Sequence, residues 1–384
     1  MKLAFLSSII TDGHPTSGYE IANEALVHGL KELDHDVTEI GFRLPRQRKA
    51  DSQNTHILGV TNFENAAAST SKKLEWIYKA IASGLPISSA KLPQSARKNL
   101  DRVLMESGPF DGLILNSYQM AAAYPELLKY PHIYVSHNVE HRSATENALR
   151  AKSRLERFLY RRDARLLKEL EKTFCDGARF VWTFSETDLA DHGVDDNRGC
   201  VLPLVAPLEQ DQSNDKDKTF DLGLIGTWSW QPNFIGLKWF LEEVVPQLSK
   251  DISIGVAGGV PSDYSVSSPN VTFLGRVESA SDFLQSVSLV PLVSKGGTGV
   301  QLKTIEALQK GFSCVATSSS LRGIEQLPEN CVQADGALDF AQAIEKLLEL
   351  EREDQFLHID GRQFYDNQRS QMLAGMVNGL LTLT

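Results

Sequence analysis

The chain has 384 residues, of which 42% are hydrophobic and 23% are charged, and its formal net charge is −10 at pH 7. This length favours two domains over one, and the apolar content excludes a chain that is disordered over most of its length. The acidic balance excludes a general nucleic-acid-binding protein. The four cysteines show no CxxC spacing and predict reduced thiols in a cytoplasmic protein: Cys175, Cys200, Cys314 and Cys331.

The first half of the chain alternates short apolar runs with helical segments. An amphipathic helix is expected over 19–33, directly after a glycine loop that contains Gly18. Buried strands are expected over 2–8, 36–42, 111–117, 132–138 and 179–185. The opening residues are interpreted as the first of these strands and not as a signal peptide, because their apolar run is too short. The alternation predicts a doubly wound parallel sheet, whereas residues 44–100 show no clear pattern.

The alternation starts again after a polar, charged segment over 208–218 that is typical of an interdomain linker. A helix is expected over 232–248, with Pro232 in its first turn. Strands are expected over 220–227, 252–259, 271–277, 288–294 and 312–318. We therefore expect an α/β protein with two Rossmann-like domains that face a central cleft, where ligands bind. The expected parts are an N-terminal domain over 1–205, a C-terminal domain over 206–362, and a helix over 363–384 that packs across the domain boundary.

A glycine-rich loop and a helix follow the expected strand at 288–294, with the sequence SKGGTGVQLKTIEALQKG over 294–311. Free backbone N–H groups at such a helix start, together with the helix dipole, bind anions. Leu302 stands where both a Walker loop and a dinucleotide fingerprint require glycine, so we predict a diphosphate cradle of another design. Its expected residues are Gly296, Gly297, Thr298, Gly299, Val300, Gln301, Leu302 and Lys303.

Glu306 follows Lys303 in the same predicted helix. A glutamate at this position can pair with a lysine three residues earlier, which is a purely structural role. Alternatively, its carboxylate accepts hydrogen bonds from the two hydroxyls of a ribose. The residues alone leave both interpretations open.

The stretch GGTGVQLKTIEAL resembles the GT-B glycosyltransferases, and most of all the retaining glycosyltransferase family 4. In that family, a glycine-rich loop and helix late in the second domain carry two glutamates with seven residues between them. The second glutamate, which grips the nucleotide ribose, corresponds to Glu306, and Thr298 stands at the position of the first, which contacts the donor sugar. The resemblance implies diphosphate binding by the loop backbone and Lys303, and it leaves recognition of the donor sugar open.

Further segments extend the resemblance over most of the chain. The run LIGTWSWQPNF resembles the start of the second domain, where commoner members have a basic pair that clamps the diphosphate and this chain has Thr227, Trp228 and Ser229. The resemblance implies that Thr227 lies at the donor diphosphate. It implies that Trp228 and Asn233 lie in the cleft.

Two other segments carry residues of the implied site. The strand VTFLGRV resembles the one whose end presents backbone groups to the nucleobase, which implies base contacts from Gly275, Arg276 and Val277. The segment TSGYEIANEAL resembles the glycine loop and helix of the first domain that face the transferred group. It implies cleft positions for Ser17 and Gly18.

His137 falls at the carboxyl end of an apolar strand, within YVSHNVEH. A buried histidine satisfied by the backbone is the structural interpretation. The resemblance implies instead a cleft histidine that contacts the transferred sugar or the leaving phosphate, with Asn138 and Glu140 beside it. HNVEH also fits the H-x-x-E-H motif of zinc peptidases, but that motif needs His137 and His141 on one helix, and a strand leads into His137.

The resemblance implies a transferase without cofactor or metal that moves a sugar of the hexose type from a nucleotide-diphosphate sugar to an acceptor hydroxyl with retention. A UDP-sugar is the favoured donor and a GDP-sugar is the second choice, and the product belongs to glycan, polysaccharide or glycolipid synthesis. Two alternatives from other classes stay open. One is a GT-B protein that binds a nucleotide sugar without transferring it, and the other is an NAD-dependent dehydrogenase that lacks its glycine fingerprint.

Basic residues concentrate in two stretches. The first contains Arg43, Arg46, Arg48 and Lys49 and permits a lipid-linked or anionic glycan acceptor. The second runs over 150–168, where acidic residues are mixed in. A solvated helix face is the structural interpretation of the second stretch. Docking to the inner, anionic surface of a membrane is the functional alternative.

Overall fold

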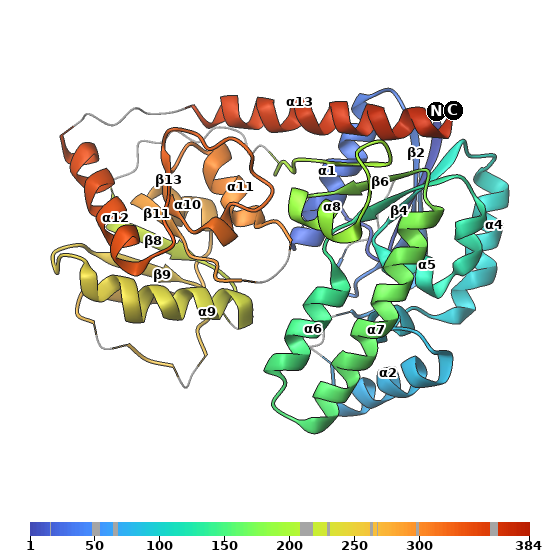
Figure 1. The fold of residues 1–384 in the computed structure, drawn as a ribbon, viewed down its shortest axis with the longest axis horizontal. Helices are drawn as coiled ribbons and strands as arrows, with labels where there is room; N and C mark the ends of the chain where they lie inside the picture. The colour runs from blue at the N-terminus through green and yellow to red at the C-terminus, as the bar shows by residue number, and fades with distance from the viewer. Residues whose placement is uncertain are drawn as a thin grey trace. The chain divides into compact units, whose positions relative to one another are not determined.

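The computed structural model of the protein describes residues 1–15, 17–47, 54–63, 68–207, 218–228, 231–261, 264–266, 268–296, 299–353 and 360–384. They form two compact units (Figure 1). The first unit consists of Met1–Leu204 and Arg369–Thr384, and the second consists of Val205–Gln368. The expected linker over 208–218 lies outside the described residues except for Lys218.

The first unit is built on a parallel sheet whose described strands follow the order β3-β2-β1-β4-β5-β6-β7. The strands are β1 (Lys2–Ser7), β2 (Asp36–Arg43), β3 (Thr55–Val60), β4 (Gly112–Asn116), β5 (His132–Ser136), β6 (Phe180–Thr183) and β7 (Gly199–Val201). The five strands predicted for this half are confirmed, and β3 and β7 add one strand at each edge. β4 and β5 are buried throughout, which is why they appear in the sequence as uninterrupted apolar runs.

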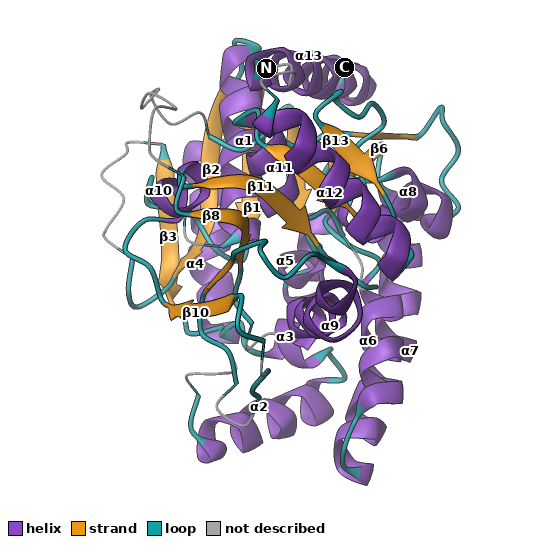
Figure 2. Ribbon diagram, turned by 90° about the vertical axis from the view of Figure 1, so that its left-hand side faces the viewer, coloured by secondary structure: helices purple, strands orange, loops and turns teal. Residues whose placement is uncertain are grey.

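Helices lie on both sides of this sheet (Figures 1 and 2). They are α1 (Gly18–Glu32), α2 (Thr70–Ser83), α3 (Ile87–Ala90), α4 (Arg97–Ser107), α5 (Tyr118–Ala123), α6 (Glu140–Arg150), α7 (Arg154–Gly177) and α8 (Glu186–His192). α6 and α7 form an antiparallel hairpin. A capping box between Ser153 and Glu156 starts α7, because each side chain bonds the backbone N–H of the other.

The second unit has a parallel sheet in the order β10-β9-β8-β11-β12-β13. Its strands are β8 (Phe220–Ile225), β9 (Ile254–Ala257), β10 (Val271–Gly275), β11 (Val287–Leu292), β12 (Ser313–Ala316) and β13 (Cys331–Gln333). Its helices are α9 (Gln231–Trp239), α10 (Ala280–Gln285), α11 (Leu302–Gln309) and α12 (Ala337–Arg352). α9 continues through a π-helical segment, Phe240–Val244, so the long helix expected over 232–248 is confirmed.

The strand order reverses between β1 and β4 in the first unit and between β8 and β11 in the second. Loops that leave the carboxyl ends of adjacent strands diverge at such a switch point and leave room for a ligand. The prediction of two doubly wound α/β sheets is therefore confirmed. Among the helices that the structure describes, none is long and apolar enough to cross a membrane.

The last helix, α13 (Gly361–Leu380), belongs to the first unit from Arg369 onward. Its Met372 and Met376 are fully buried. A Cβ at Gly29 of α1 would lie 2.9 Å from the sulfur of Met376, so the ends of the methionine side chains pack directly against the backbone of α1 at this position. Arg369 pairs with Glu32 of α1 and fixes the helix at its other side.

Candidate active site

The loop between β11 and α11 is held in place by the segment that follows β12. Ser320 Oγ accepts a hydrogen bond from the backbone N–H of Ser294 at 2.8 Å. Arg322 donates from Nη1 to the carbonyl oxygen of Gly299 at 3.0 Å. Gly296 and Gly299 have φ angles of 84° and 79°, a region that favours glycine, so the loop requires glycines at these positions. Ser320 and Arg322 are not among the site residues predicted from the sequence.

Backbone donors at the start of α11 point to an anion site. Gln301 precedes the helix and makes no side-chain cap. Within the described residues, no hydrogen bond uses the N–H groups of Gln301, Leu302 or Lys303, as expected for a first helical turn without a cap. These groups and the helix dipole together favour an anion. Gly297 and Thr298 lie outside the described residues. Val300 is described and lies between Gly299 and Gln301, the residue that precedes α11.

Lys303 brings a positive charge to the same place. Its Nζ lies 5.6 Å from the centroid of the Trp228 ring, and burial lowers the pKa of its ammonium to about 8. No carboxylate pairs with it in the part of the chain that the structure describes. A partly buried cation without a counter-charge is costly, and an anionic ligand would lower that cost.

Trp228 is a core residue and not part of an open cleft. Its side chain is 1% exposed, and its indole N–H donates to the carbonyl oxygen of Ala257 at 2.7 Å. The ring therefore makes a cation–π contact with the ammonium of Lys303. Thr227 is exposed, and its carbonyl oxygen accepts a hydrogen bond from Asn233 Nδ2 at 3.3 Å.

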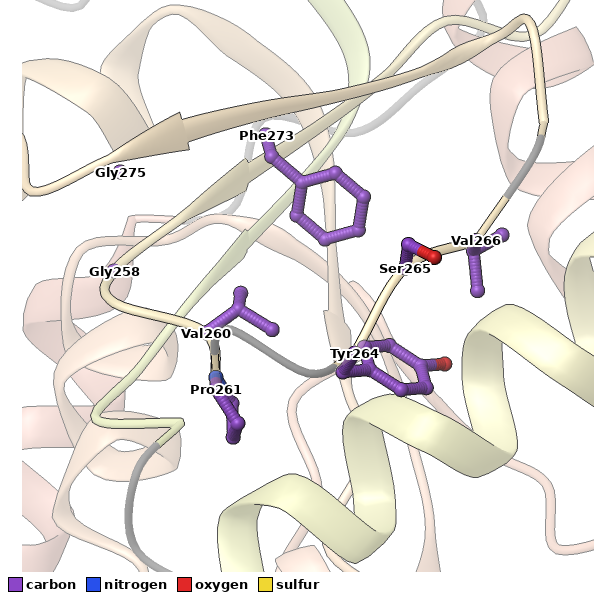
Figure 3. Close-up of a pocket in the computed structure, with 8 residues that line it drawn as sticks. All are labelled: Gly258, Val260, Pro261, Tyr264, Ser265, Val266, Phe273 and Gly275. Carbon is purple, nitrogen blue, oxygen red and sulfur yellow. The ribbon is translucent and has the colours of Figure 1, made fainter.

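A pocket of about 350 Å³ opens at the carboxyl ends of β9 and β10 (Figure 3). Gly258 and Gly275 lie at the strand ends, and the remaining lining is mostly apolar: Val260, Pro261, Tyr264, Ser265, Val266 and Phe273. Tyr264 packs edge-on against Phe234 of α9 with centroids 4.9 Å apart. Gly275 thus lines a cavity as well as ending a strand, whereas Arg276 and Val277 follow it and are outside the lining.

In the first unit, His137 follows β5 and contacts residues from α1, β4 and the loop after β6. Its Nε2 lies 2.7 Å from Asn116 Oδ1. Its ring lies 4.7 Å from that of Tyr19 and meets the ring of Phe184 edge-on at 4.8 Å, measured between centroids. Burial lowers the pKa of His137 to about 3, so the imidazole is neutral at physiological pH. Its predicted place at a strand end is confirmed, and its contact with a ligand stays a prediction.

A chain of hydrogen bonds determines which nitrogen of His137 carries the proton. The carbonyl oxygen of Ile9 can only accept, so the Asn23 group 2.9 Å away is the amide N–H₂. The Asn23 oxygen accepts from Asn116 Nδ2 at 2.6 Å, which turns the Asn116 oxygen toward His137. His137 therefore donates from Nε2, and its Nδ1 keeps a lone pair for which the described residues provide no donor. The ring can accept a hydrogen bond from a ligand hydroxyl.

This assignment can be measured without any substrate. In protein with ¹⁵N-labelled histidine, NMR at about pH 7 should show His137 as the neutral Nε2–H tautomer. Asn116→Asp should raise the pKa of the imidazole, because a carboxylate facing Nε2 stabilises the cation, and an NMR titration toward lower pH would show the rise. His137→Gln identifies the signal by its loss. A wild-type signal with the proton on Nδ1 would contradict the assignment.

Glu140 starts α6 beside a buried carboxylate. Glu171, which is 2% exposed, accepts from the Glu140 backbone N–H at 2.6 Å and from His141 Nδ1 at 2.6 Å. Burial and the charge of Glu171 raise the pKa of Glu140 to about 7, while Asn138 Nδ2 contacts its Oε1 at 3.4 Å. His137 precedes α6 and His141 lies in its first turn, so the two do not share a helix face as a zinc-peptidase motif requires.

Ser17 and Gly18 begin α1, and Ser17 has a structural role as its N-cap. Its Oγ accepts from the Glu20 backbone N–H at 3.3 Å and donates to Glu20 Oε2 at 2.8 Å. Glu20 is 1% exposed and also accepts from Gln47 Nε2 at 2.6 Å and from Arg46 Nη2 at 3.4 Å. The first basic stretch is thus bound into the fold at Arg46, and its last two members lie outside the described residues.

Comparisons with known proteins give one family match within the second unit and structural similarities over the whole chain. Residues 219–350 match the family model Glycosyl transferases group 1. No curated protein sequence matches the chain.

Solved structures extend the likeness to the whole chain. Sucrose-phosphate synthase from Thermosynechococcus elongatus is similar with a TM-score of 0.60 and 14% identity over 99% of this chain and 96% of that one. HepE from Anabaena in complex with UDP has a TM-score of 0.60 and 14% identity, with both chains fully covered. WaaG, a glycosyltransferase involved in lipopolysaccharide biosynthesis, has a TM-score of 0.60 and 13% identity over 99% of each chain.

These likenesses and the two parallel sheets show a GT-B fold, and the second unit carries a group 1 glycosyltransferase domain. The resemblance predicted from the sequence is therefore confirmed at this level. The narrower assignment to family 4 stays a prediction.

Proposed function

We propose that this protein transfers a sugar of the hexose type from a nucleotide-diphosphate sugar to an acceptor hydroxyl, with retention of anomeric configuration and without a metal ion. The observation that carries this proposal is the partly buried ammonium of Lys303 beside the N–H groups that start α11, none of which has a partner among the described residues. Such a site stabilises a leaving diphosphate, on which negative charge builds up as the glycosidic bond breaks.

The remainder of the donor fits along the same edge of the sheet. Glu306 lies one helical turn after Lys303 on α11, where its carboxylate is proposed to bind the ribose hydroxyls. The pocket at Gly275 offers an apolar space for a base, and Arg276 and Val277, which follow Gly275 in the chain, are proposed to contact the base as well. A UDP-sugar is the favoured donor and a GDP-sugar the second choice; HepE, which shares the fold, was solved with UDP and with UDP and glucose.

The first unit is proposed to bind the acceptor and the transferred sugar. His137 offers a neutral acceptor nitrogen, and Asn138 and Glu140 follow it at the start of α6. In a front-face reaction, the leaving phosphate oxygen takes the proton of the acceptor hydroxyl, so no side-chain nucleophile is needed. Because Thr298 replaces the sugar-reading glutamate, the donor sugar is proposed to be read by the loop backbone and by the first unit.

We place this reaction in the cytoplasm, in glycan, polysaccharide or glycolipid synthesis. All four cysteines are free, as expected for a reducing compartment. The second candidate is a protein that binds a nucleotide sugar without transferring it, which the absence of a basic pair near Thr227 favours. Slow hydrolysis of a donor sugar by the purified protein would decide against this candidate.

Thermal unfolding in the presence of single nucleotides tests the donor site directly. UDP at saturating concentration should raise the melting temperature by several degrees, because it binds only the folded protein. Glu306→Ala should abolish most of this rise, since two hydrogen bonds to the ribose are lost.

GDP and a panel of UDP- and GDP-sugars, measured in the same way, would identify the base and the sugar. Glu349→Ala, an exposed change on α12 of the same unit, is the matched control and should respond to UDP like the wild type. The proposed function fails if no nucleoside diphosphate shifts the transition. An unchanged response of Glu306→Ala removes only the ribose role.

A further inference from the structure

Large exposed apolar side chains gather at one end of the first unit. Sixteen such side chains occur in the described part of the chain, and seven of them belong to α2, the end of α6 and the first two turns of α7. These seven are Leu74, Tyr78, Ile81, Leu149, Leu155, Phe158 and Tyr160. Their exposed fractions reach 76% at Leu149 and 74% at Tyr78. Single exposed apolar residues are normal, but a cluster of this kind marks an interaction surface.

α2 and the α6–α7 hairpin form one continuous end of the unit. Arg162 of α7 donates to the carbonyl oxygen of Ala80 in α2 at 2.6 Å and to that of Leu85 at 3.0 Å. Asp163 accepts from the backbone N–H of Ile87 at 2.9 Å and continues the same junction. Figure 2 shows α2 and the tip of α7 projecting from the unit in the same direction.

The exposed face of α7 adds a line of positive charge. Residues 154, 158, 161, 165 and 168 are spaced by four and three positions, so they lie along one face of the helix. Their side chains are all exposed: Arg154, Phe158, Arg161, Arg165 and Lys168. We call these five residues the α7 stripe. It contains four cations and no acid, and none of the four has an ion-pair partner among the described residues.

A solvated helix face explains the cations but not the apolar residues between them. Phe158 stands within the stripe at 61% exposure, and Leu155, at 59%, lies three residues before it on the same side of the helix. Long basic side chains around exposed aromatic and aliphatic groups are the composition of an element that lies on a lipid bilayer. A second copy of this chain is a poor partner for the same surface, because two stripes of like charge would repel each other.

We propose that the tip formed by α2, the end of α6 and the α7 stripe docks onto an anionic lipid bilayer. Leu149, Leu155 and Phe158 enter the interface between headgroups and acyl chains, while the four cations of the stripe contact lipid phosphates. This docking is independent of the transfer reaction. It brings the tip of the α6–α7 hairpin against the membrane surface, and Glu140 lies at the opposite end of α6 from that tip.

Co-sedimentation of the full chain with lipid vesicles tests the proposal. The protein should bind vesicles that contain both phosphatidylcholine and phosphatidylglycerol, and it should not bind vesicles of pure phosphatidylcholine. Binding to the anionic vesicles should weaken strongly at high salt. Arg161→Ala with Arg165→Ala should lower the affinity about 30-fold, because each cation near an anionic surface contributes about fivefold. Phe158→Glu should lower it at least about tenfold.

Met105→Glu is the matched control for Phe158→Glu, since Met105 is 75% exposed on α4, outside this surface, and it should bind like the wild type. Unchanged circular dichroism shows that the variants fold. No binding to anionic vesicles would overturn the proposal. So would a dimer in analytical ultracentrifugation that Phe158→Glu dissolves, because the surface would then pair with a second copy.

Discussion

Lys303→Met should lower kcat/KM for the nucleotide-sugar donor about 100- to 1,000-fold, the range seen when one preorganised donor to a developing negative charge is removed. The methionine keeps the length and the apolar stem of the side chain, so the packing against Trp228 is preserved. What disappears is the charge that meets the leaving diphosphate. Steady-state kinetics with the donor identified by thermal unfolding is the measurement, and Lys346→Met on the exposed side of α12 is the matched control.

The pH dependence gives this expectation a second readout. The pKa of Lys303 is about 8 in the folded protein and about 10.5 in an unfolded chain, so the folded state binds fewer protons between these values. The ligand-free wild type should therefore gain stability relative to Lys303→Met as the pH rises from 8 to 10.5, and UDP affinity should fall above pH 8. Equal pH profiles of stability and UDP binding in wild type and variant would show that Lys303 has no such role.

His137→Ala should cut turnover about 100-fold while the affinity for UDP stays nearly the same. The imidazole is neutral, and its Nε2 is committed to Asn116, so it can orient a hydroxyl but cannot neutralise a phosphate. The loss should therefore appear in kcat and not in the dissociation constant of UDP, as calorimetry and steady-state kinetics can separate.

A conservative variant distinguishes orientation from folding. His137→Gln keeps an amide that can both donate to Asn116 and accept from a ligand, so it should recover part of the lost turnover. Normal turnover in His137→Ala would make this histidine purely structural. A parallel loss of UDP affinity would instead place it at the phosphate, against the neutral tautomer described above.

Hydrophobic patterning was sufficient to predict the sheets, because their central strands are buried on both faces. The edge strand β3 was missed because its residues are only half-buried and their polar neighbours resemble a loop. Similarly, β7 and β13 have three residues each, too few to show a period. The anion site could be predicted because a glycine loop, a strand and a helix start are contiguous in the chain.

The supporting residues of the site could not be predicted in the same way. Asn23 and Asn116 are 93 positions apart; α1 holds Asn23 at the end of β1, and the pairing of β1 with β4 brings Asn116 beside it. Glu171 reaches the start of α6 from the far end of α7, and Arg322 reaches the glycine loop from beyond β12. Trp228 was placed in the cleft by its position in a motif, and its indole turns inward because the Ala257 carbonyl offers a partner.

The return of α13 to the first unit affects the order in which the protein can mature on the ribosome. Met372 and Met376 cover the surface of α1 at Gly29, and Leu383 covers β4 at Gly112, so the first sheet lacks part of its cover until residues 369–384 have been synthesised. The second unit, which is continuous over Val205–Gln368, can complete its contacts earlier. The first unit begins to emerge before the second and yet completes its folding after it, so nascent chains stalled before Arg369 should expose apolar surface to chaperones.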